Sequence, residues 1–157
     1  MTPAEIHSRL KEKFPSAVGE WQEPKAGDPC ILLEPQELHE VCLFLKSEPG
    51  LEFDYLKLIT GVDRGDKLSS VYHLYSYKHQ HALVLRADVE RAEPKLPSVA
   101  DIWPAADWLE RECFDMLGIV YQGHPDLRRI LLPLDWEGYP LRKDYKQPQS
   151  YHGIKNE

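Results

Sequence analysis

Three carboxylates and a histidine lie close together in one stretch of the chain: Glu110, Glu112, Asp115 and His124. Such a set could act as a general acid and base, or bind a metal ion. The surrounding sequence argues against both roles, because no nucleophile, phosphate-binding loop or HExxH spacing accompanies it. Arg111 and Asp115 are also four residues apart and can pair on a helix. We therefore expect no catalytic residue, cofactor site or metal site in this chain.

A helix is needed to position these residues, and the sequence predicts one over 107–118. Asp107 is expected to cap its start, Glu110 to complete a capping box, and Gly118 to end it in the left-handed conformation. The apolar stripe of this helix consists of Trp108, Leu109, Cys113, Met116 and Leu117. Glu112 falls on the stripe at helical spacing, so we expect it to face the interior and to need a cationic partner. The candidate partners are Arg128, Arg129 and Arg142.

A second possible ligand pair is His79 and His81, which are two residues apart and would share one face of a strand. They also lie where a hairpin turn is expected, and the sequence offers no third ligand nearby. We interpret the pair as part of a solvated turn.

Basic and aromatic residues alternate near the C-terminus: Arg128, Arg129, Trp136, Tyr139, Arg142, Lys143, Tyr145 and Lys146. This pattern is typical of both nucleic-acid and protein interfaces. Acidic residues at 135, 137 and 144 interrupt the basic groups, and the chain has a formal net charge of −7. Nucleic-acid binding is therefore disfavoured. Arginine and aromatic side chains are enriched at protein interfaces, so we expect a protein partner.

Length and composition predict one globular domain with a tail. The chain has 157 residues, of which 42% are hydrophobic and 29% are charged. The three cysteines are far apart, which fits a reducing compartment. No apolar run approaches the roughly 20 residues of a membrane-spanning helix. Because the N-terminus is typical of a capped helix rather than a secretory signal, we expect no export.

The order of elements predicts an α+β fold with N-terminal helices and an antiparallel sheet of three to four strands. Thr2, Pro3 and Glu5 are typical of a helix start, and a second helix is predicted within 35–50. The segments 51–63, 68–78 and 81–89 are predicted to be consecutive strands, forming a meander. The capped helix at 107–118 follows.

From residue 128 onward, prolines and the absence of periodicity predict an extended arm. Residues 1–127 carry 13 basic and 22 acidic side chains, whereas residues 128–157 carry 6 and 4, so the basic end is a candidate contact surface. Its leucines, tryptophan and tyrosines exceed what a disordered tail carries. We therefore predict an α+β domain over 1–127 and a C-terminal arm over 128–157 that packs on a partner protein.

Three motifs in this region resemble a known family: ERExxD at 110–115, HPDLRRI at 124–130 and WEGYPLRKDY at 136–145. In this order they are similar to the C subunit, also called the 30 kDa-type subunit, of proton-pumping NADH:quinone oxidoreductase, respiratory complex I. The segments 52–63, 70–77 and 96–108 also resemble the family. Related subunits occur in membrane-bound hydrogenases and in coenzyme F420-linked quinone or phenazine reductases, which remain the alternative.

The resemblance implies a non-catalytic subunit of an NADH:quinone oxidoreductase that supports assembly. It implies docking on the large D subunit, which holds the quinone site, and a place near the B subunit, which holds an iron–sulfur cluster. The location would be peripheral, on the cytoplasmic side of the bacterial inner membrane. NADH, FMN, iron–sulfur clusters and quinone would belong to the parent complex. The interface and structural residues implied are Glu110, Arg111, Glu112, Asp115, His124, Arg128, Arg129, Trp136, Pro140, Leu141, Arg142, Lys143 and Asp144.

Overall fold

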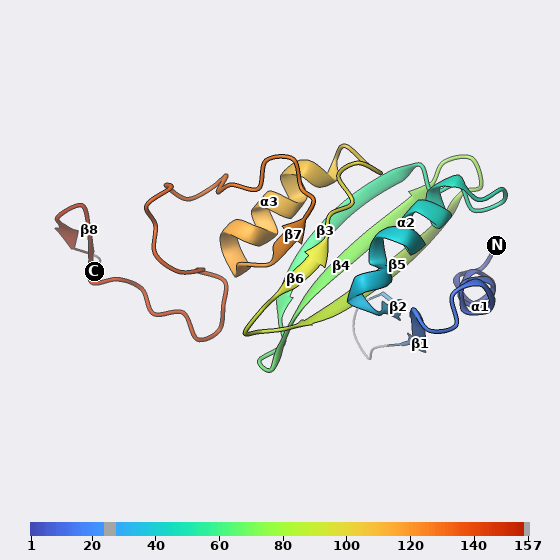
Figure 1. Cartoon of the computed structure of the whole chain (residues 1–157), viewed down its shortest axis with the longest axis horizontal. Coiled ribbons are helices and arrows are strands. Elements are labelled where there is room, and N and C mark those ends of the chain that lie inside the picture. Colours follow the sequence, from blue (N-terminus) through green and yellow to red (C-terminus); the bar gives the residue numbers. More distant parts are fainter. Residues whose placement is uncertain (24–27, 156–157) are drawn as a thin grey trace.

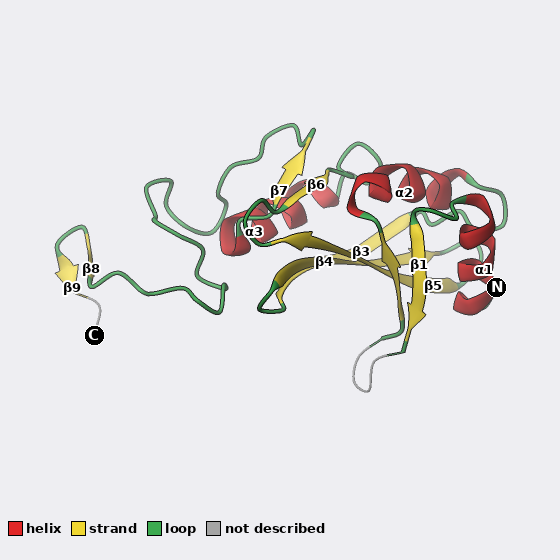
Figure 2. Cartoon of the chain, turned by 60° about the horizontal axis from the view of Figure 1, so that its bottom comes forward, coloured by secondary structure: helices red, strands yellow, loops and turns green. Residues whose placement is uncertain are grey.

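The computed structural model describes residues 1–23 and 28–155, and its fold is α+β, as the sequence predicts. Helices α2 and α3 lie over one face of a twisted sheet, and the last part of the chain extends away from this body (Figure 1, Figure 2). The larger elements are α1 (Pro3–Lys13), α2 (Leu38–Ser47), α3 (Ala106–Leu117), β3 (Tyr55–Asp63), β4 (Lys67–Ser76) and β5 (His81–Glu90). The smaller ones are β1 (Val18–Gln22), β2 (Cys30–Leu33), η1 (Pro35–Glu37), β6 (Lys95–Pro97), β7 (Val120–Gln122), β8 (Ser150–Tyr151) and β9 (Ile154–Lys155).

The predicted meander is present, but the sheet is larger than expected and is mixed. Its strand order is β1-β2-β5-β4-β3, which makes five strands rather than three or four. Strands β3, β4 and β5 pair in antiparallel fashion, with Tyr72 opposite Leu85 and Ile59 opposite Tyr72. Strand β2 runs parallel to β5, with Ile31 opposite Leu85, so the expectation of a purely antiparallel sheet was wrong.

The two N-terminal helices form where they were expected. Thr2 and Glu5 make both hydrogen bonds of a capping box at the start of α1. The helical repeat in α2 buries Leu38, Val41, Cys42 and Leu45 against the sheet. These residues join a core that includes Tyr72 and Leu85.

Helix α3 begins one residue earlier than predicted and without the predicted cap. Its N-cap residue is Ala105, which makes no side-chain capping bond, so Asp107 and Glu110 do not form a capping box. Its end agrees with the prediction, since Gly118 adopts the left-handed conformation with φ of 74°. Strand β6 precedes α3 and strand β7 follows it. The two strands pair in parallel, which brings together the segments on either side of the helix.

Candidate functional site

The buried carboxylate of Asp115 binds the first residues of the C-terminal arm to α3. Its Oδ2 accepts three consecutive backbone N–H bonds, from Ile130 at 3.0 Å, Leu131 at 2.7 Å and Leu132 at 2.9 Å. Its Oδ1 accepts from Arg129 Nη1 at 2.7 Å. Burial alone would raise the pKa of this carboxyl, but these donors hold the pKa below its ordinary value of 3.8. The carboxylate is therefore stable as an anion, and it fixes the first turn of the arm.

Arg129 also binds residues farther along the arm. Its Nη2 donates to the carbonyl oxygens of Trp136 and Gly138, each at 3.0 Å. The Tyr139 ring is flanked by two guanidiniums, Arg129 at 5.4 Å and Arg142 at 4.8 Å from the ring centroid. Arg142 Nε also donates to the Leu117 carbonyl at 2.6 Å, which returns the chain to the end of α3.

A second anchor lies at the end of β3, where the carboxylate of Asp63 binds the later part of the arm. Its side chain is 3% exposed and accepts from Arg91 Nη1 at 2.7 Å and from the Lys143 and Gly65 backbone N–H groups at 2.7 and 2.8 Å. The Arg91 hydrogen bond is the main reason that the pKa of Asp63 falls to about 2. Arg91 also bonds to Asp144, so residues 143–144 are tied to the sheet by both members of the Asp63–Arg91 pair.

Glu112 does not take the place that the sequence predicts. It is exposed, and the three candidate arginines bond elsewhere, to Asp126, Asp115 and the Leu117 carbonyl. Arg111 likewise does not pair with Asp115: its Nε donates to the Arg128 carbonyl at 3.3 Å, and its guanidinium lies 5.6 Å from the Trp108 ring centroid. The error comes from Trp108, which is 67% exposed and does not belong to the buried stripe.

Glu110 is instead the glutamate that α3 buries. Its Oε1 accepts from the Val99 N–H at 2.8 Å and its Oε2 from the Ser98 hydroxyl at 2.6 Å. His124 lies beside it with a fully buried side chain, 4.0 Å from Nε2 to Glu110 Oε2. Burial dominates here and raises the pKa of Glu110 to about 7. Two of the residues singled out from the sequence thus meet, although not in the predicted roles.

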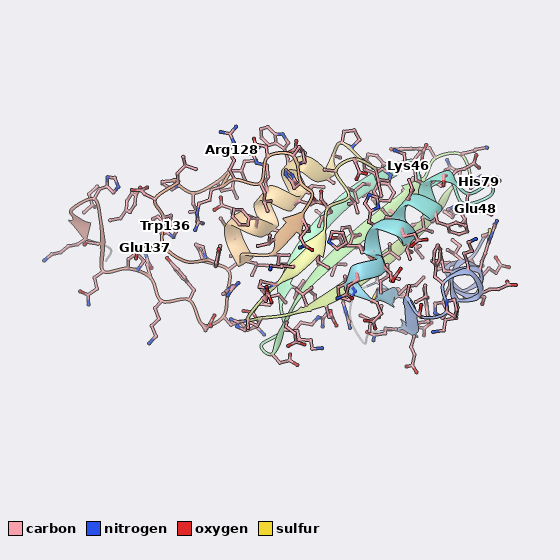
Figure 3. The ribbon with its side chains drawn as sticks, in the orientation of Figure 1. Lys46, Glu48, His79, Arg128, Trp136 and Glu137 are labelled. Atoms are coloured by element: carbon pink, nitrogen blue, oxygen red, sulfur yellow. The ribbon has the colours of Figure 1, made fainter. Side chains whose placement is uncertain are left out.

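The other predicted arm residues divide into inward polar groups and outward apolar ones. Trp136 Nε1 donates to the Tyr145 hydroxyl at 3.1 Å, and Pro140 is half-buried. The Lys143 side chain is exposed, whereas its backbone N–H donates to Asp63. In contrast, three leucines point to solvent: Leu131 at 63% exposure, Leu134 at 78% and Leu141 at 61%. Figure 3 shows Arg128, Trp136 and Glu137 along the arm, at the opposite end of the molecule from His79.

The His79 and His81 pair has a different environment from the one predicted. His79 bonds to Glu52 at 2.5 Å, and His81 is buried rather than solvated, with Nε2 2.9 Å from the Leu51 carbonyl oxygen. Among residues 1–23 and 28–155, no three His, Cys, Asp or Glu side chains are arranged to hold a metal ion. No helix in that same part of the chain is long and apolar enough to cross a membrane.

Sequence reasoning missed Asp63 and Arg91 of the second anchor, Ser98 beside Glu110, and the position of Tyr139 against two arginines. Asp63 ends a strand and Arg91 follows another, so no local pattern links either residue to the arm. One available signal was the place of Asp63 at the end of a strand, because a carboxylate that becomes buried there needs donors.

Comparison with known proteins gives a consistent assignment. Residues 31–151 match the family described as respiratory-chain NADH dehydrogenase, 30 Kd subunit. The C subunit of NADH-quinone oxidoreductase from Chloroherpeton thalassium is 44% identical over 148 residues, which cover 93% of this chain and 62% of that protein. The corresponding protein of Chlorobium phaeobacteroides is 41% identical over 149 residues, covering 93% of this chain and 90% of that protein.

Two solved structures have the same fold. The trypsin-resistant fragment of Nqo5 matches with a TM-score of 0.65 and 28% identity, over 78% of this chain and 98% of that one. A chain of the archaeal membrane-bound sulfane sulfur reductase matches with a TM-score of 0.73 and 24% identity, over 91% and 85% of the two chains, and shows the fold alone. The chain therefore belongs to the family of 30 kDa subunits of the respiratory-chain NADH dehydrogenase.

Proposed function

We propose that this chain is a non-catalytic subunit of a proton-translocating NADH:quinone oxidoreductase and that it supports the assembly of the complex. The observation that carries the proposal is the arm, whose polar groups bond within the chain while Leu131, Leu134 and Leu141 face solvent. Apolar side chains held outward on an ordered segment are suited to a lasting protein interface. The curated relatives named above are C subunits of NADH-quinone oxidoreductases, which favours this complex over the hydrogenase-type alternative.

In this proposal the arm, residues 128–157, docks on the large D subunit, which holds the quinone site, and the chain lies near the iron–sulfur B subunit. NADH, FMN, the iron–sulfur clusters and quinone are bound by other subunits. The complex would hold this chain peripherally on the cytoplasmic side of the inner membrane. The motif residues from Glu110 to Asp144 then act by shaping and presenting the arm, through the two carboxylate anchors of Asp115 and Asp63.

The test is a charge placed on the outward face of the arm. Leu134→Asp should weaken binding to the complex by about 2 kcal/mol or more, roughly 30-fold, because it removes apolar burial of about that size and places a carboxylate in the interface. The measurement is the amount of assembled complex recovered with the tagged chain from gently solubilised membranes, together with quinone reduction per assembled complex.

Leu43→Asp is the matched control, since Leu43 is 48% exposed on α2, away from the arm. It should leave recovery unchanged. Equal loss with both variants would show that general surface hydrophobicity, rather than the arm, drives association. A fall in turnover per assembled complex, with recovery intact, would contradict the non-catalytic role.

A further inference from the structure

Glu110 is a buried carboxylate without a full counter-charge. Its side chain has no exposed surface, and its two hydrogen-bond donors, the Ser98 hydroxyl and the Val99 N–H, are both neutral. In the described part of the chain, no lysine or arginine forms an ion pair with it. An ionised carboxylate in such a place is costly unless it is paired or takes up a proton.

The hydrogen bonds of His124 show which of its nitrogens carries the proton. Nδ1 lies 3.0 Å from the Asp126 backbone nitrogen, and because that N–H can only donate, Nδ1 accepts and is unprotonated. Nε2 therefore carries the ring proton and donates to the Asp107 carbonyl oxygen at 3.0 Å. The ring is neutral in this arrangement, so it does not neutralise Glu110 across the 4.0 Å between them.

Other acidic groups near Glu110 also raise its pKa. Burial is the largest cause that raises the pKa of Glu110, and the negative charges of Asp101 and Asp107 raise it further, whereas Ser98 and Val99 lower it. The remaining titratable groups that face it are His124 from the turn after β7, Cys42 from α2, Tyr72 from β4 and Cys113 from α3. None of these supplies a positive charge in the observed arrangement.

We propose that Glu110 and His124 form a proton-responsive joint between helix α3, the 98–100 segment and the turn at 124–126, the root of the arm. With a proton on Glu110, the buried group is uncharged and the three segments stay packed around it. When Glu110 loses that proton, the buried negative charge has no cation beside it, and it becomes hydrated only if the segments part. The turn that leads to Arg128 and the Asp115 anchor is then released at its first hydrogen bond.

The direction of the pH effect follows from the folded state binding a proton that the unfolded chain has lost. The ordinary pKa of a glutamate is 4.5 and that of Glu110 is about 7, so the joint is most stable below pH 4.5 and loses stability as the pH rises to about 7. The Val99 and Asp126 amides lie on the two segments that the joint holds. Above pH 7 their hydrogen exchange should therefore speed up by more than the rise in intrinsic exchange rate with pH explains.

The experiment is an NMR titration of the whole chain with 13C-labelled glutamate, combined with amide exchange at Val99 and Asp126. The expected result is one carboxyl resonance with a midpoint near pH 7, absent from Glu110→Gln, and a pH-dependent exchange that Glu110→Gln abolishes. Glu112→Gln is the matched control, since Glu112 is exposed on the same helix, and it should retain both effects. A Glu110 midpoint near 4.5, or exchange at Asp126 that does not follow it, would overturn the proposal.

Ser98→Ala provides a second variant if Glu110→Gln does not fold. It removes one donor to the ionised carboxyl, so the Glu110 midpoint should move to higher pH. An unchanged or lower midpoint would also overturn the proposal. Because these measurements use this chain alone, their outcome is independent of which partner the arm binds.

Discussion

Asp115 accepts three consecutive backbone N–H groups and a guanidinium, and charge-assisted bonds of this kind are stronger than those between neutral groups. Neither a longer acid nor a neutral amide can reproduce this arrangement, because both carboxylate oxygens are used and the partners include a full positive charge. At the scale of single residues, the anchoring of residues 130–132 therefore depends on the charge and length of the Asp115 side chain.

Asp115→Asn should release residues 130–132 from α3. The substitution leaves Arg129 without a buried anionic partner and replaces one acceptor by an amide donor, at a cost of roughly 3–5 kcal/mol for the anchored state. Hydrogen exchange of the Leu131 and Leu132 amides should lose its protection, while the core amides of β4 keep theirs. Glu112→Gln, on the exposed face of the same helix, should leave all of these amides unchanged.

The second anchor, formed by Asp63, should be sensitive to acid. Its pKa is lowered from 3.8 to about 2, so its stabilising contribution is complete above pH 3.8 and is lost as the pH falls toward 2. Asp63→Asn should therefore lower the free energy of unfolding by about 2 kcal/mol at neutral pH, the usual value for a charged hydrogen bond. Denaturant titrations from pH 7 to pH 2 should show the difference shrinking to near zero at the acidic end; a constant difference would contradict the assignment.

The sequence identified the right stretch of chain for these sites but exchanged the roles of two glutamates. Placing Trp108 in the buried stripe of α3 turns Glu112 inward and leaves Glu110 as a cap. The helix instead buries Ala106, Glu110, Cys113 and Leu117, and exposes Trp108. A large aromatic residue beside an arginine can lie on the surface as a stacked pair, and periodicity alone cannot distinguish that case from a core position.

At the scale of elements, Gly118 connects the end of α3 to the arm in two ways. Its φ of 74° ends the helix, and a Cβ at this position would lie 2.6 Å from the Tyr139 ring. Gly118→Ala should therefore cost the left-handed penalty of about 1 kcal/mol and also displace Tyr139 from its contacts with Arg129 and Arg142. Fluorescence or NMR of Tyr139, together with the free energy of unfolding, measures the two effects.

Gly123→Ala separates these effects. Gly123 also has a positive φ, of 83°, but a Cβ there would meet nothing within 4 Å. This variant should show the conformational penalty alone and leave Tyr139 in place. If the two variants had the same effect on Tyr139, the steric role of Gly118 would be wrong.

Some strands could be predicted from the sequence and others could not. Alternation over ten residues in β4 and in β5 predicts both strands, because one face of each is buried. Strands β1 and β2 have five and four residues and were missed. The parallel pairing of β2 with β5 joins segments about fifty residues apart, and no local pattern encodes such a pairing.

At the scale of the whole molecule, the two anchors predict where a protease can enter. Lys146 is exposed and lies beyond both anchors, whereas the backbone around Arg129 is bound to Asp115. Trypsin should cut the native chain first after Lys146. Cleavage after Arg128 and Arg129 should become roughly 100-fold faster or more in Asp115→Asn, in proportion to the population of released arm. Mass spectrometry of a time course measures both rates, and early cleavage after Arg129 in the unmodified chain would contradict the anchoring.

Because the arm is anchored at both α3 and the end of β3, it can take its final position only after both elements have formed. Asp115 acquires its environment only when α3 has formed, and Asp63 only when β3 has paired and Arg91 has come into place beside it. A nascent or misfolded chain consequently has no means to display Leu131, Leu134 and Leu141 in their final arrangement. The arrangement of these leucines on the surface therefore depends on the folding of both α3 and the sheet.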